Sequence, residues 1–296
     1  MGKIKISVIV PTYNRLALLE RQVDQLVNQT LDVKEYEVII VNDGSSDGTQ
    51  EFLDACMKSH PNVQVIHQIN GGPAKARNTA VKAANGSIIA FTDDDCEVAR
   101  DWLQVILREM SDEVVGLQGM TYTDNKKVTP LTHQIDNRKG HHSIPTCNAA
   151  YRRDRLIQID GFDESFPYPH NEDTDVGWRM QELGIVKFCA DMKVYHPPRT
   201  DQFSKVAKRM NILDSEFTLY EKNPQLYKKY RNTNPLRHIY SNVFVNVMLY
   251  YTYSRFKYWK RPKLMIQGLA ITLIWWLDLI KKYPRYRSIY QSMRQL

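Results

Sequence analysis

The sequence has few cysteines and no close pair of them. Its four cysteines, Cys56, Cys96, Cys147 and Cys189, lie far apart, and none forms a C-x-x-C pair. This spacing argues against a zinc ribbon and against a disulfide framework, so we expect reduced thiols, as in a cytosolic protein. Only 13 Gly and 13 Pro occur among 296 residues, which excludes collagenous and low-complexity chains.

Two other signatures are missing. The first apolar run, residues 6–10, has only five residues before Pro11, whereas the core of a secretion signal needs roughly 7–15. We therefore expect a buried strand there and not a signal. The turn at Gly71 and Gly72 lacks the lysine signature of a phosphate-binding P-loop, so that class of nucleotide site is not predicted.

Short apolar runs alternate with helical patterns through the first hundred residues. The runs lie at residues 6–10, 36–42, 63–67 and 87–92, and most residues in each are apolar. Such runs indicate strands buried on both faces, and their alternation with helices indicates a parallel sheet covered by helices, the α/β class. Polar clusters follow three of these runs directly, at the sheet edge where such folds bind ligands. Residues 123–143 are polar and unpatterned, and we expect a mobile loop there.

The character of the chain changes near residue 200, which predicts two domains, 1–198 and 199–296. Strand patterns vanish beyond that point. Residues 1–198 hold 21 Lys and Arg against 28 Asp and Glu, a net charge of −7, whereas residues 199–296 hold 19 against 5, a net charge of +14. The overall charge of +7 therefore arises from the second domain, and we expect any anionic partner to bind there.

Three consecutive acids, Asp93, Asp94 and Asp95, follow the fourth apolar run. Their mutual repulsion calls for a cation or for hydrogen-bond donors nearby, and a hard divalent metal with diphosphate oxygens is a natural partner. If the segment is extended, Asp93 and Asp95 point the same way, so that one can face a metal and the other a hydroxyl group. The alternative is a solvated acidic turn.

Five motifs then occur in order along the chain. They are SVIVPTYNR at residues 7–15, VNDGSSDGT at 41–49, ARN at 76–78, AFTDDD at 90–95 and NEDTD at 171–175. Together they resemble glycosyltransferase family 2, over about residues 5–198. The resemblance implies an A-type fold, a Rossmann-like mixed and mostly parallel sheet flanked by helices, here with a C-terminal helical appendage. It also implies metal-dependent, inverting transfer from a UDP-sugar.

The same resemblance assigns residues to the donor pocket. They are Pro11, Thr12, Tyr13, Arg15, Asp43, Gly71, Arg77, Asp93, Asp94 and Asn148. Asp43 matches the aspartate that accepts a hydrogen bond from uracil N3–H; an ionised carboxylate only accepts, so uridine is favoured and thymidine remains an alternative. Arg77 matches a position above the nucleotide, its alternative being an ordinary helix-surface arginine. Asp93 and Asp94 are expected near ribose and sugar, and Asn148 near the donor sugar.

The remaining roles concern the metal and the proton. Asp95 is the expected ligand of Mn²⁺ or Mg²⁺, and His196 either completes that site or is an ordinary loop histidine; imidazole suits Mn²⁺ better than Mg²⁺. In the pair Glu172-Asp173, Asp173 is the expected general base, because a helix N-terminus keeps a carboxylate ionised. The acceptor is expected to be a growing surface glycan or a lipid-linked saccharide.

The second domain contains two strongly apolar stretches, residues 242–256 and 264–280, with basic residues between and after them. A helix over 264–280 has 17 residues and reaches roughly 25 Å, short of the ~30 Å hydrocarbon core. We expect either a peripheral contact with the anionic inner face of the cell membrane, packing on the catalytic domain, a homo-oligomer interface, or a true span.

Two other function classes compete with the enzyme. One is a catalytically silent sugar-nucleotide-binding or scaffold subunit recruited through its C-terminal helices, against which the intact acid motifs argue. The other is a nucleic-acid binder, suggested only by the basic second domain; no stacking or base-reading motif accompanies it, so no nucleic-acid partner is predicted.

Overall fold

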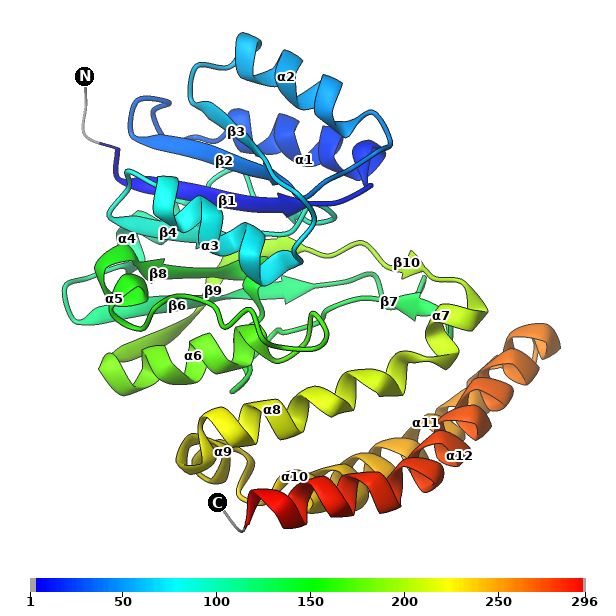
Figure 1. Ribbon diagram of the computed structural model, residues 1–296. Helices are drawn as coiled ribbons and strands as arrows, with labels where there is room; N and C mark the ends of the chain where they lie inside the picture. Colours follow the sequence, from blue (N-terminus) through cyan, green and yellow to red (C-terminus); the bar gives the residue numbers. More distant parts are fainter. Residues whose placement is uncertain (1–3, 295–296) are drawn as a thin grey trace. The chain divides into compact units, whose positions relative to one another are not determined.

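The computed structural model describes residues 4–294, which form two compact units (Figure 1). Among the described residues, unit 1 comprises 4–123, 135–165 and 172–197, and unit 2 comprises 124–134, 166–171 and 198–294. The chain leaves unit 1 for the last time at residue 197. Two segments differ from the prediction, because 124–134 and 166–171 belong with the C-terminal residues.

Unit 1 is built on an eight-stranded sheet with the strand order β3-β2-β1-β4-β8-β6-β9-β5. The strands are β1 (Ile6–Thr12), β2 (Tyr36–Asn42), β3 (Val63–His67), β4 (Ile88–Phe91), β5 (Glu97–Val98), β6 (Val114–Tyr122), β8 (Ala149–Arg152) and β9 (Ile185–Tyr195). β1 pairs in parallel with β2 and β4, β2 with β3, and β6 with β9, whereas β8 runs antiparallel between β4 and β6, and β5 antiparallel to β9. The sheet is therefore mixed and mostly parallel, as predicted.

Helices cover both faces of this sheet (Figure 1). They are α1 (Leu16–Val27), α2 (Thr49–Ser59), α3 (Pro73–Ala83), α4 (Trp102–Glu109), α5 (Arg153–Gln158) and α6 (Glu172–Leu183), with one 3₁₀ turn, η1 (Thr146–Asn148). In β1, Val8 and Val10 pack in the core with α1, α2 and α4, while Ile9 packs on the opposite face with α3, α5 and α6. This alternation explains why β1 has apolar residues at both odd and even positions, since both of its faces are buried.

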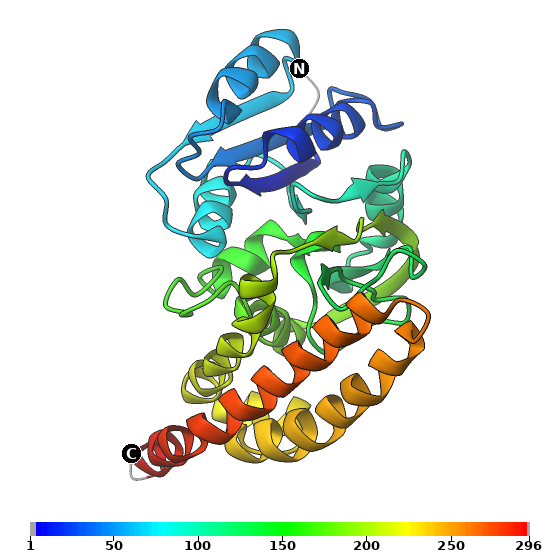
Figure 2. The same ribbon diagram turned by 90° about the vertical axis from the view of Figure 1, so that its right-hand side faces the viewer.

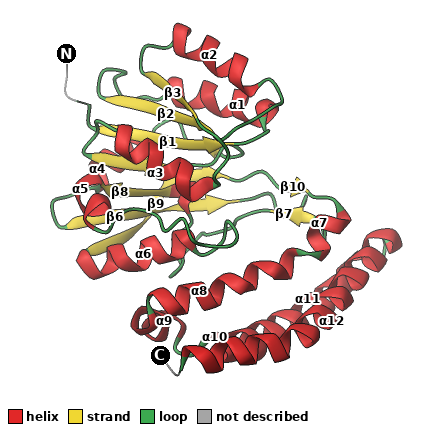
Figure 3. Cartoon of the chain, in the orientation of Figure 1, coloured by secondary structure: helices red, strands yellow, loops and turns green. Residues whose placement is uncertain are grey.

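Unit 2 is almost entirely helical (Figure 3). Its elements are β7 (Thr132–His133), β10 (Arg199–Thr200), α7 (Phe203–Ala207), η2 (Arg209–Asp214), α8 (Ser215–Lys222), α9 (Pro224–Arg231), α10 (Pro235–Arg237), the π-helical turn η3 (His238–Val247), α11 (Met248–Arg255), η4 (Phe256–Tyr258) and α12 (Pro262–Met293). β7 and β10 pair antiparallel. The prediction of an unpatterned loop over 123–143 is therefore wrong in part, because this segment contains β7 and Asn137, which bridges to Thr121 of β6.

A buried carboxylate organises the interior of unit 2. Glu216 accepts hydrogen bonds from Tyr227 Oη at 2.8 Å and from Asn171 Nδ2 at 3.0 Å, and it pairs with Arg231 at 3.2 Å. Burial by itself raises the pKa of Glu216, but Arg231 and the other partners outweigh it and lower the pKa below its ordinary value. The segment 166–171 is thus held to α8 through Asn171, which has a positive φ of 72°.

The last helix is longer than predicted. α12 has 32 residues, and among the described residues it is long and apolar enough to cross a membrane by length and composition alone. The argument that this stretch is too short to span is therefore wrong. The helix continues past Lys281 and through Pro284 because Tyr286, two residues after the proline, is buried in the core of unit 2.

Candidate active site

The predicted site residues of unit 1 gather where parallel strands end. Thr12 ends β1, Asp43 follows β2, and Asp93 lies two residues after β4. Because β1, β2 and β4 run parallel, their carboxyl ends lie at one edge of the sheet. His196 follows β9, which is parallel to β6.

The acid triplet forms a turn and not an extended segment. Arg15 Nη1 lies 2.7 Å from Asp94 Oδ1 and 3.1 Å from Asp95 Oδ2, so one guanidinium serves two neighbouring acids. Asp93 instead meets Arg77. The expectation that Asp93 and Asp95 point the same way is therefore wrong, because it assumed the two-residue repeat of a strand.

Asp94 is the most enclosed of the three acids, with 3% of its surface exposed. Its Oδ2 accepts a hydrogen bond from Thr12 Oγ1 at 2.8 Å, and its Oδ1 accepts from Arg15. Burial raises the pKa of Asp94 to about 6, although Arg15 opposes the rise. Both oxygens are thus engaged inside the protein, and contact of Asp94 with a ribose or sugar stays a prediction.

Arg77 joins the two acidic motifs. It lies on α3 and is buried; its Nη2 donates to Asp93 Oδ1 at 3.0 Å, and its Nη1 donates to Glu172 Oε1 at 3.1 Å. Burial raises the pKa of Glu172, neighbouring Asp173 adds to the rise, and Arg77 opposes it. Within unit 1, Arg77 is therefore an interior ion-pair residue and not an ordinary helix-surface arginine.

The charges at this edge remain unbalanced. Five carboxyl groups stand against two guanidinium groups; the acids are Asp93, Asp94, Asp95, Glu172 and Asp173, and the bases are Arg15 and Arg77. Two buried polar atoms, Arg77 Nε and Glu172 Oε2, have no hydrogen-bond partner among the described residues. A site that is acidic and incompletely hydrogen-bonded suits a polar, cation-containing ligand.

A single carboxylate holds the glycine turn before α3. Asp43 Oδ1 accepts from Gln68 Nε2 at 2.7 Å and from the Gly71 amide at 2.9 Å, and Oδ2 accepts from the Gly72 amide at 2.9 Å. Gly72 has φ +86°, a conformation that favours glycine. An ionised carboxylate offers about four acceptor positions, so Asp43 retains one for a further donor such as an imide N–H.

The other predicted donor contacts differ in accessibility. Tyr13 is exposed, Pro11 is half-buried, and Thr12 is buried against Asp94. Asn148 is almost fully buried: its Oδ1 accepts from the Trp102 indole at 2.9 Å, while its Nδ2 donates to the Met120 and Met192 carbonyls. These bonds give Asn148 a structural role, and its contact with the donor sugar stays a prediction.

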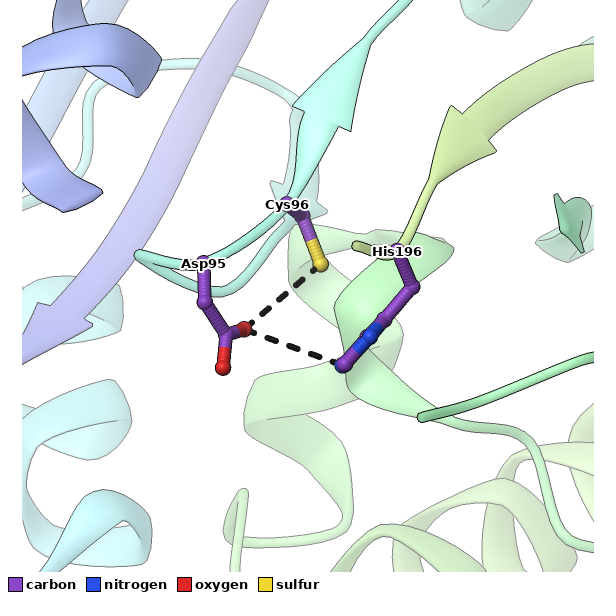
Figure 4. A group of neighbouring side chains, drawn as sticks. All are labelled: Asp95, Cys96 and His196. Carbon is purple, nitrogen blue, oxygen red and sulfur yellow. Dashed lines mark hydrogen bonds and ion pairs between the residues drawn. The ribbon is translucent and has the colours of Figure 1, made fainter. Parts of the chain in front are cut away.

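Asp95 and His196 come together as a candidate metal site (Figure 4). His196 Nε2 lies 3.8 Å from Asp95 Oδ1, and Cys96 Sγ lies 3.9 Å from the same oxygen. The three candidate ligand atoms all fall within 4.8 Å of one another. Mn²⁺ and Mg²⁺ prefer carboxylate oxygen, and Mn²⁺ accepts imidazole as well, so the donor set fits through Asp95 and His196, with Cys96 beside them.

Glu172 and Asp173 begin α6 but differ in their surroundings. Glu172 is buried against Arg77, whereas Asp173 is partly exposed. Asp173 Oδ1 accepts from the Thr174 amide at 2.7 Å. At the first turn of a helix the macrodipole favours a negative charge. Of the two acids, Asp173 is therefore the more accessible, and its role as the base stays a prediction.

Sequence reasoning missed Gln22. This residue is 1% exposed on the inner side of α1, and its Nε2 donates to Thr92 Oγ1 at 3.2 Å and to the Asp93 carbonyl. It thereby ties α1 to the start of the acid turn. A signal was available, because Gln22 lies within the apolar stripe formed by Leu19, Val23 and Leu26.

Comparison with known proteins supports this arrangement. The model of the family described as Glycosyl transferase family 2 matches residues 7–171, more than half of the chain. Among curated proteins, glycosyltransferase AglE of Haloferax volcanii is 28% identical over 204 residues, which is 66% of this chain and 67% of that protein. Chondroitin synthase of Pasteurella multocida is 36% identical over 194 residues, which is 62% of this chain but only 19% of that protein.

Two solved structures share the fold over most of the chain. A mannosyltransferase from Pyrobaculum calidifontis, in complex with GDP-Man and Mn²⁺, matches with a TM-score of 0.63 at 18% identity, covering 95% of this chain and 87% of that one. Residues 1–349 of S. aureus TarS, in complex with UDP, match with a TM-score of 0.60 at 20% identity, covering 99% and 92%. At these identities the likeness concerns the fold.

Proposed function

Because the chain belongs to glycosyl transferase family 2, we propose that it is a metal-dependent, inverting enzyme that moves a sugar from a UDP-sugar to an acceptor hydroxyl. The observation that carries the proposal is the position of Arg77 between Asp93 and Glu172. Through it the acid triplet after β4 and the acid pair at the start of α6 belong to one site. A donor-binding motif and a candidate base are thereby brought together in unit 1.

The donor is proposed to bind along the ends of β1, β2 and β4. Asp43 accepts the imide N–H of uracil through its remaining acceptor position, next to the bonds it makes to the Gly71 and Gly72 amides. Pro11, Thr12 and Tyr13 line the base and ribose. The UDP complex of TarS, a protein with the same fold, is consistent with a uridine donor. The same fold also accepts a guanosine donor, as in the GDP-Man complex of the mannosyltransferase.

A divalent cation is proposed to sit between Asp95 and His196. When bound, it supplies positive charge to the diphosphate as the leaving group acquires negative charge. Arg15 already holds Asp95 at 3.1 Å and so orients one of the two ligands. The acids in this region outnumber the bases, so they would repel an anionic donor. A cation between the acids and the diphosphate removes this repulsion.

Asp173 is proposed as the general base. Its carboxylate takes the proton of the acceptor hydroxyl while that oxygen forms a bond to the anomeric carbon, and the bond from this carbon to the diphosphate oxygen breaks. Attack opposite the leaving group inverts the anomeric configuration. Glu172 keeps its buried contact with Arg77 and thereby fixes the beginning of α6 next to the base.

The acceptor is proposed to be a growing surface glycan or a lipid-linked saccharide, used on the cytoplasmic side of the cell membrane. A glycan-building role is consistent with relatives such as chondroitin synthase, of which this chain covers only a small part. The competing proposal, a catalytically silent sugar-nucleotide-binding subunit, shares the donor pocket but requires no base.

A panel of UDP-sugars, with GDP-Man as the comparison donor, tests this proposal. We expect release of UDP from at least one UDP-sugar with Mn²⁺ present, and loss of that release when EDTA removes the metal. Binding of UDP without turnover of any UDP-sugar, even with lipid-linked acceptors added, would favour the silent subunit.

A further inference from the structure

Exposed apolar side chains are concentrated on two helices of unit 2. Of the large hydrophobic residues that are exposed in the described chain, most lie between residues 245 and 283. On η3, α11 and η4 they are Val245, Val247, Leu249, Tyr250, Tyr253 and Phe256, with Trp259 just beyond. On α12 they are Ile266, Leu273, Ile274, Leu277, Ile280 and Tyr283. Concentrations of this kind mark interaction surfaces.

These residues form one outward stripe on each helix. On α12 the exposed positions 266, 273, 277 and 280 recur at helical spacing, and the buried residues Ile271, Trp275 and Leu279 occupy the opposite side. On α11, Met248 is buried, while Leu249 and Tyr253 are exposed. Figure 2 shows α12 running beside α11, and the buried sides of both pack into the same core. We call the two outward stripes together the apolar face.

The charges around the apolar face have one sign. Residues 242–254 and 264–277 contain no charged side chain. Exposed cations stand between these stretches, namely Lys257, Lys260, Arg261 and Lys263, and two more, Lys281 and Arg287, follow them. Asp278 is the one acid between residues 237 and 294, and it pairs with Lys282 at 2.8 Å. An apolar surface bordered by cations matches the acyl and headgroup layers of an anionic membrane.

Aromatic residues lie where such a surface meets water. Tyr253 is 78% exposed, and Trp259, in the basic turn before α12, is 68% exposed. Tyrosine and tryptophan favour the headgroup level because their rings are apolar and their polar tips stay hydrated. Their position next to Lys257 and Lys260 agrees with the order of layers at a lipid interface.

The opposite side of α12 argues against its crossing the membrane, despite its length. Trp275 Nε1 donates to the Val206 carbonyl at 2.9 Å, and Lys282 Nζ donates to Asn211 Oδ1 at 2.6 Å. Arg285 pairs with Asp214 at 3.2 Å. A spanning α12 would have to exchange these polar partners for lipid, at a large desolvation cost. Only the apolar face is available to acyl chains.

We propose that the apolar face binds the surface of an anionic lipid bilayer, with α11 and α12 lying in the plane of the headgroups and neither helix crossing. This proposal deepens the membrane location proposed above. It rests on the proposed function only in that a membrane-bound acceptor would give the enzyme a reason to bind a membrane. Its evidence lies wholly within unit 2, so it can fail while the transferase reaction stands.

Vesicle sedimentation with the full chain, without donor or acceptor, tests the proposal. We expect binding to phosphatidylcholine vesicles that contain phosphatidylglycerol, and weaker, salt-insensitive binding to phosphatidylcholine alone. The double variant Leu273→Gln/Leu277→Gln should lose roughly tenfold or more in affinity, because two apolar side chains no longer enter the bilayer. The matched variant Val33→Gln/Met57→Gln, which changes two exposed apolar residues of unit 1, should bind like the parent.

A charge variant tests the cations around the apolar face separately from its apolar side chains. Lys260→Gln/Lys263→Gln should weaken binding to anionic vesicles severalfold and reduce its salt dependence, whereas Lys58→Gln/Lys82→Gln in unit 1 should not. Equal vesicle binding by the parent and by both face variants would overturn the proposal. So would a stable dimer that Leu273→Gln/Leu277→Gln dissociates, since a second copy would then cover the face.

Alkaline carbonate extraction of cell membranes decides between lying and crossing. We expect the full chain to be released, as a surface-bound protein is, while a marker protein that spans the membrane stays behind. Retention of the chain with that marker would overturn the interfacial placement.

Discussion

Nη1 of Arg77 lies 3.1 Å from Oε1 of Glu172, although 95 residues separate the two in the chain. Both side chains are buried, so neither charge is screened by water as a surface pair would be. The same guanidinium also reaches Asp93. Arg77 therefore links the donor-side acids to the helix that carries the proposed base. Its contact with Glu172 leads to predictions for the free energy of unfolding and for how that free energy changes with pH.

Replacing Arg77 should be costly. Arg77→Ala leaves Asp93 and Glu172 without their shared cation, and we expect a loss of about 3–5 kcal/mol in the free energy of unfolding. Arg108→Ala is the matched control, because Arg108 pairs with two acids at the surface, where water screens the charges, and its loss should cost far less stability. Urea unfolding measures both. Similar losses in the two variants would mean that the Arg77 contact does not stabilise unit 1.

Glu172 should make stability fall as pH rises. Its pKa in the folded protein is raised above the ordinary value of 4.5 by burial, so above that pH the folded state holds a proton that the unfolded state has released. Stability is then lost progressively until the pH exceeds the folded pKa. Glu172→Gln cannot titrate. Its unfolding free energy, relative to the parent, should therefore be higher at pH 8 than at pH 5; an unchanged difference would contradict the raised pKa.

Metal binding should depend on Asp95 and His196. Asp95→Ala and His196→Ala should each weaken Mn²⁺ binding by about tenfold or more, since each removes a ligand. The loss of the free Mn²⁺ signal in electron paramagnetic resonance reports binding without any turnover. His67→Ala serves as the control, because His67 also lies 3.1 Å from a carboxylate, that of Asp54, but outside the candidate site. Equal Mn²⁺ affinity in all three variants would remove the metal assignment.

Asp43 should control donor affinity through two kinds of contact. Asp43→Asn retains one acceptor oxygen, so it cannot serve both glycine amides and the base as the carboxylate can. We expect UDP to bind about tenfold or more weakly by calorimetry. Asp54→Asn, which alters a partly exposed acid on α2, should leave UDP affinity unchanged. A normal affinity of Asp43→Asn would show that this acid serves only the turn.

The parallel half of the sheet could be predicted because its signal is local. β2 and β3 coincide with the predicted strands at 36–42 and 63–67, and α2 lies between them, where the alternation of strands and helices predicts a helix. A buried strand and an amphipathic helix can each be recognised from about ten consecutive residues.

Side-chain pairing could not be predicted in the same way. Arg15 meets Asp94 across 79 positions and Asp95 across 80, and only tertiary packing brings them together. The acid triplet was expected to be extended because its turn depends on those partners. Residues 281–293 fall outside the predicted helix because the charged Lys281 and Lys282 end the apolar run and Pro284 is unfavourable inside a helix, whereas the burial of Tyr286 stabilises the longer helix.

The variant Asp173→Asn tests whether Asp173 removes the proton of the acceptor hydroxyl. This change keeps the size of the side chain and removes its basicity, so UDP and Mn²⁺ should bind as in the parent while sugar transfer falls by roughly a hundredfold or more in kcat. Thr174→Asn, at the next residue, distinguishes a general disturbance of α6 from loss of the base. Normal kcat in Asp173→Asn, with donor binding intact, would contradict the role of Asp173 as the general base.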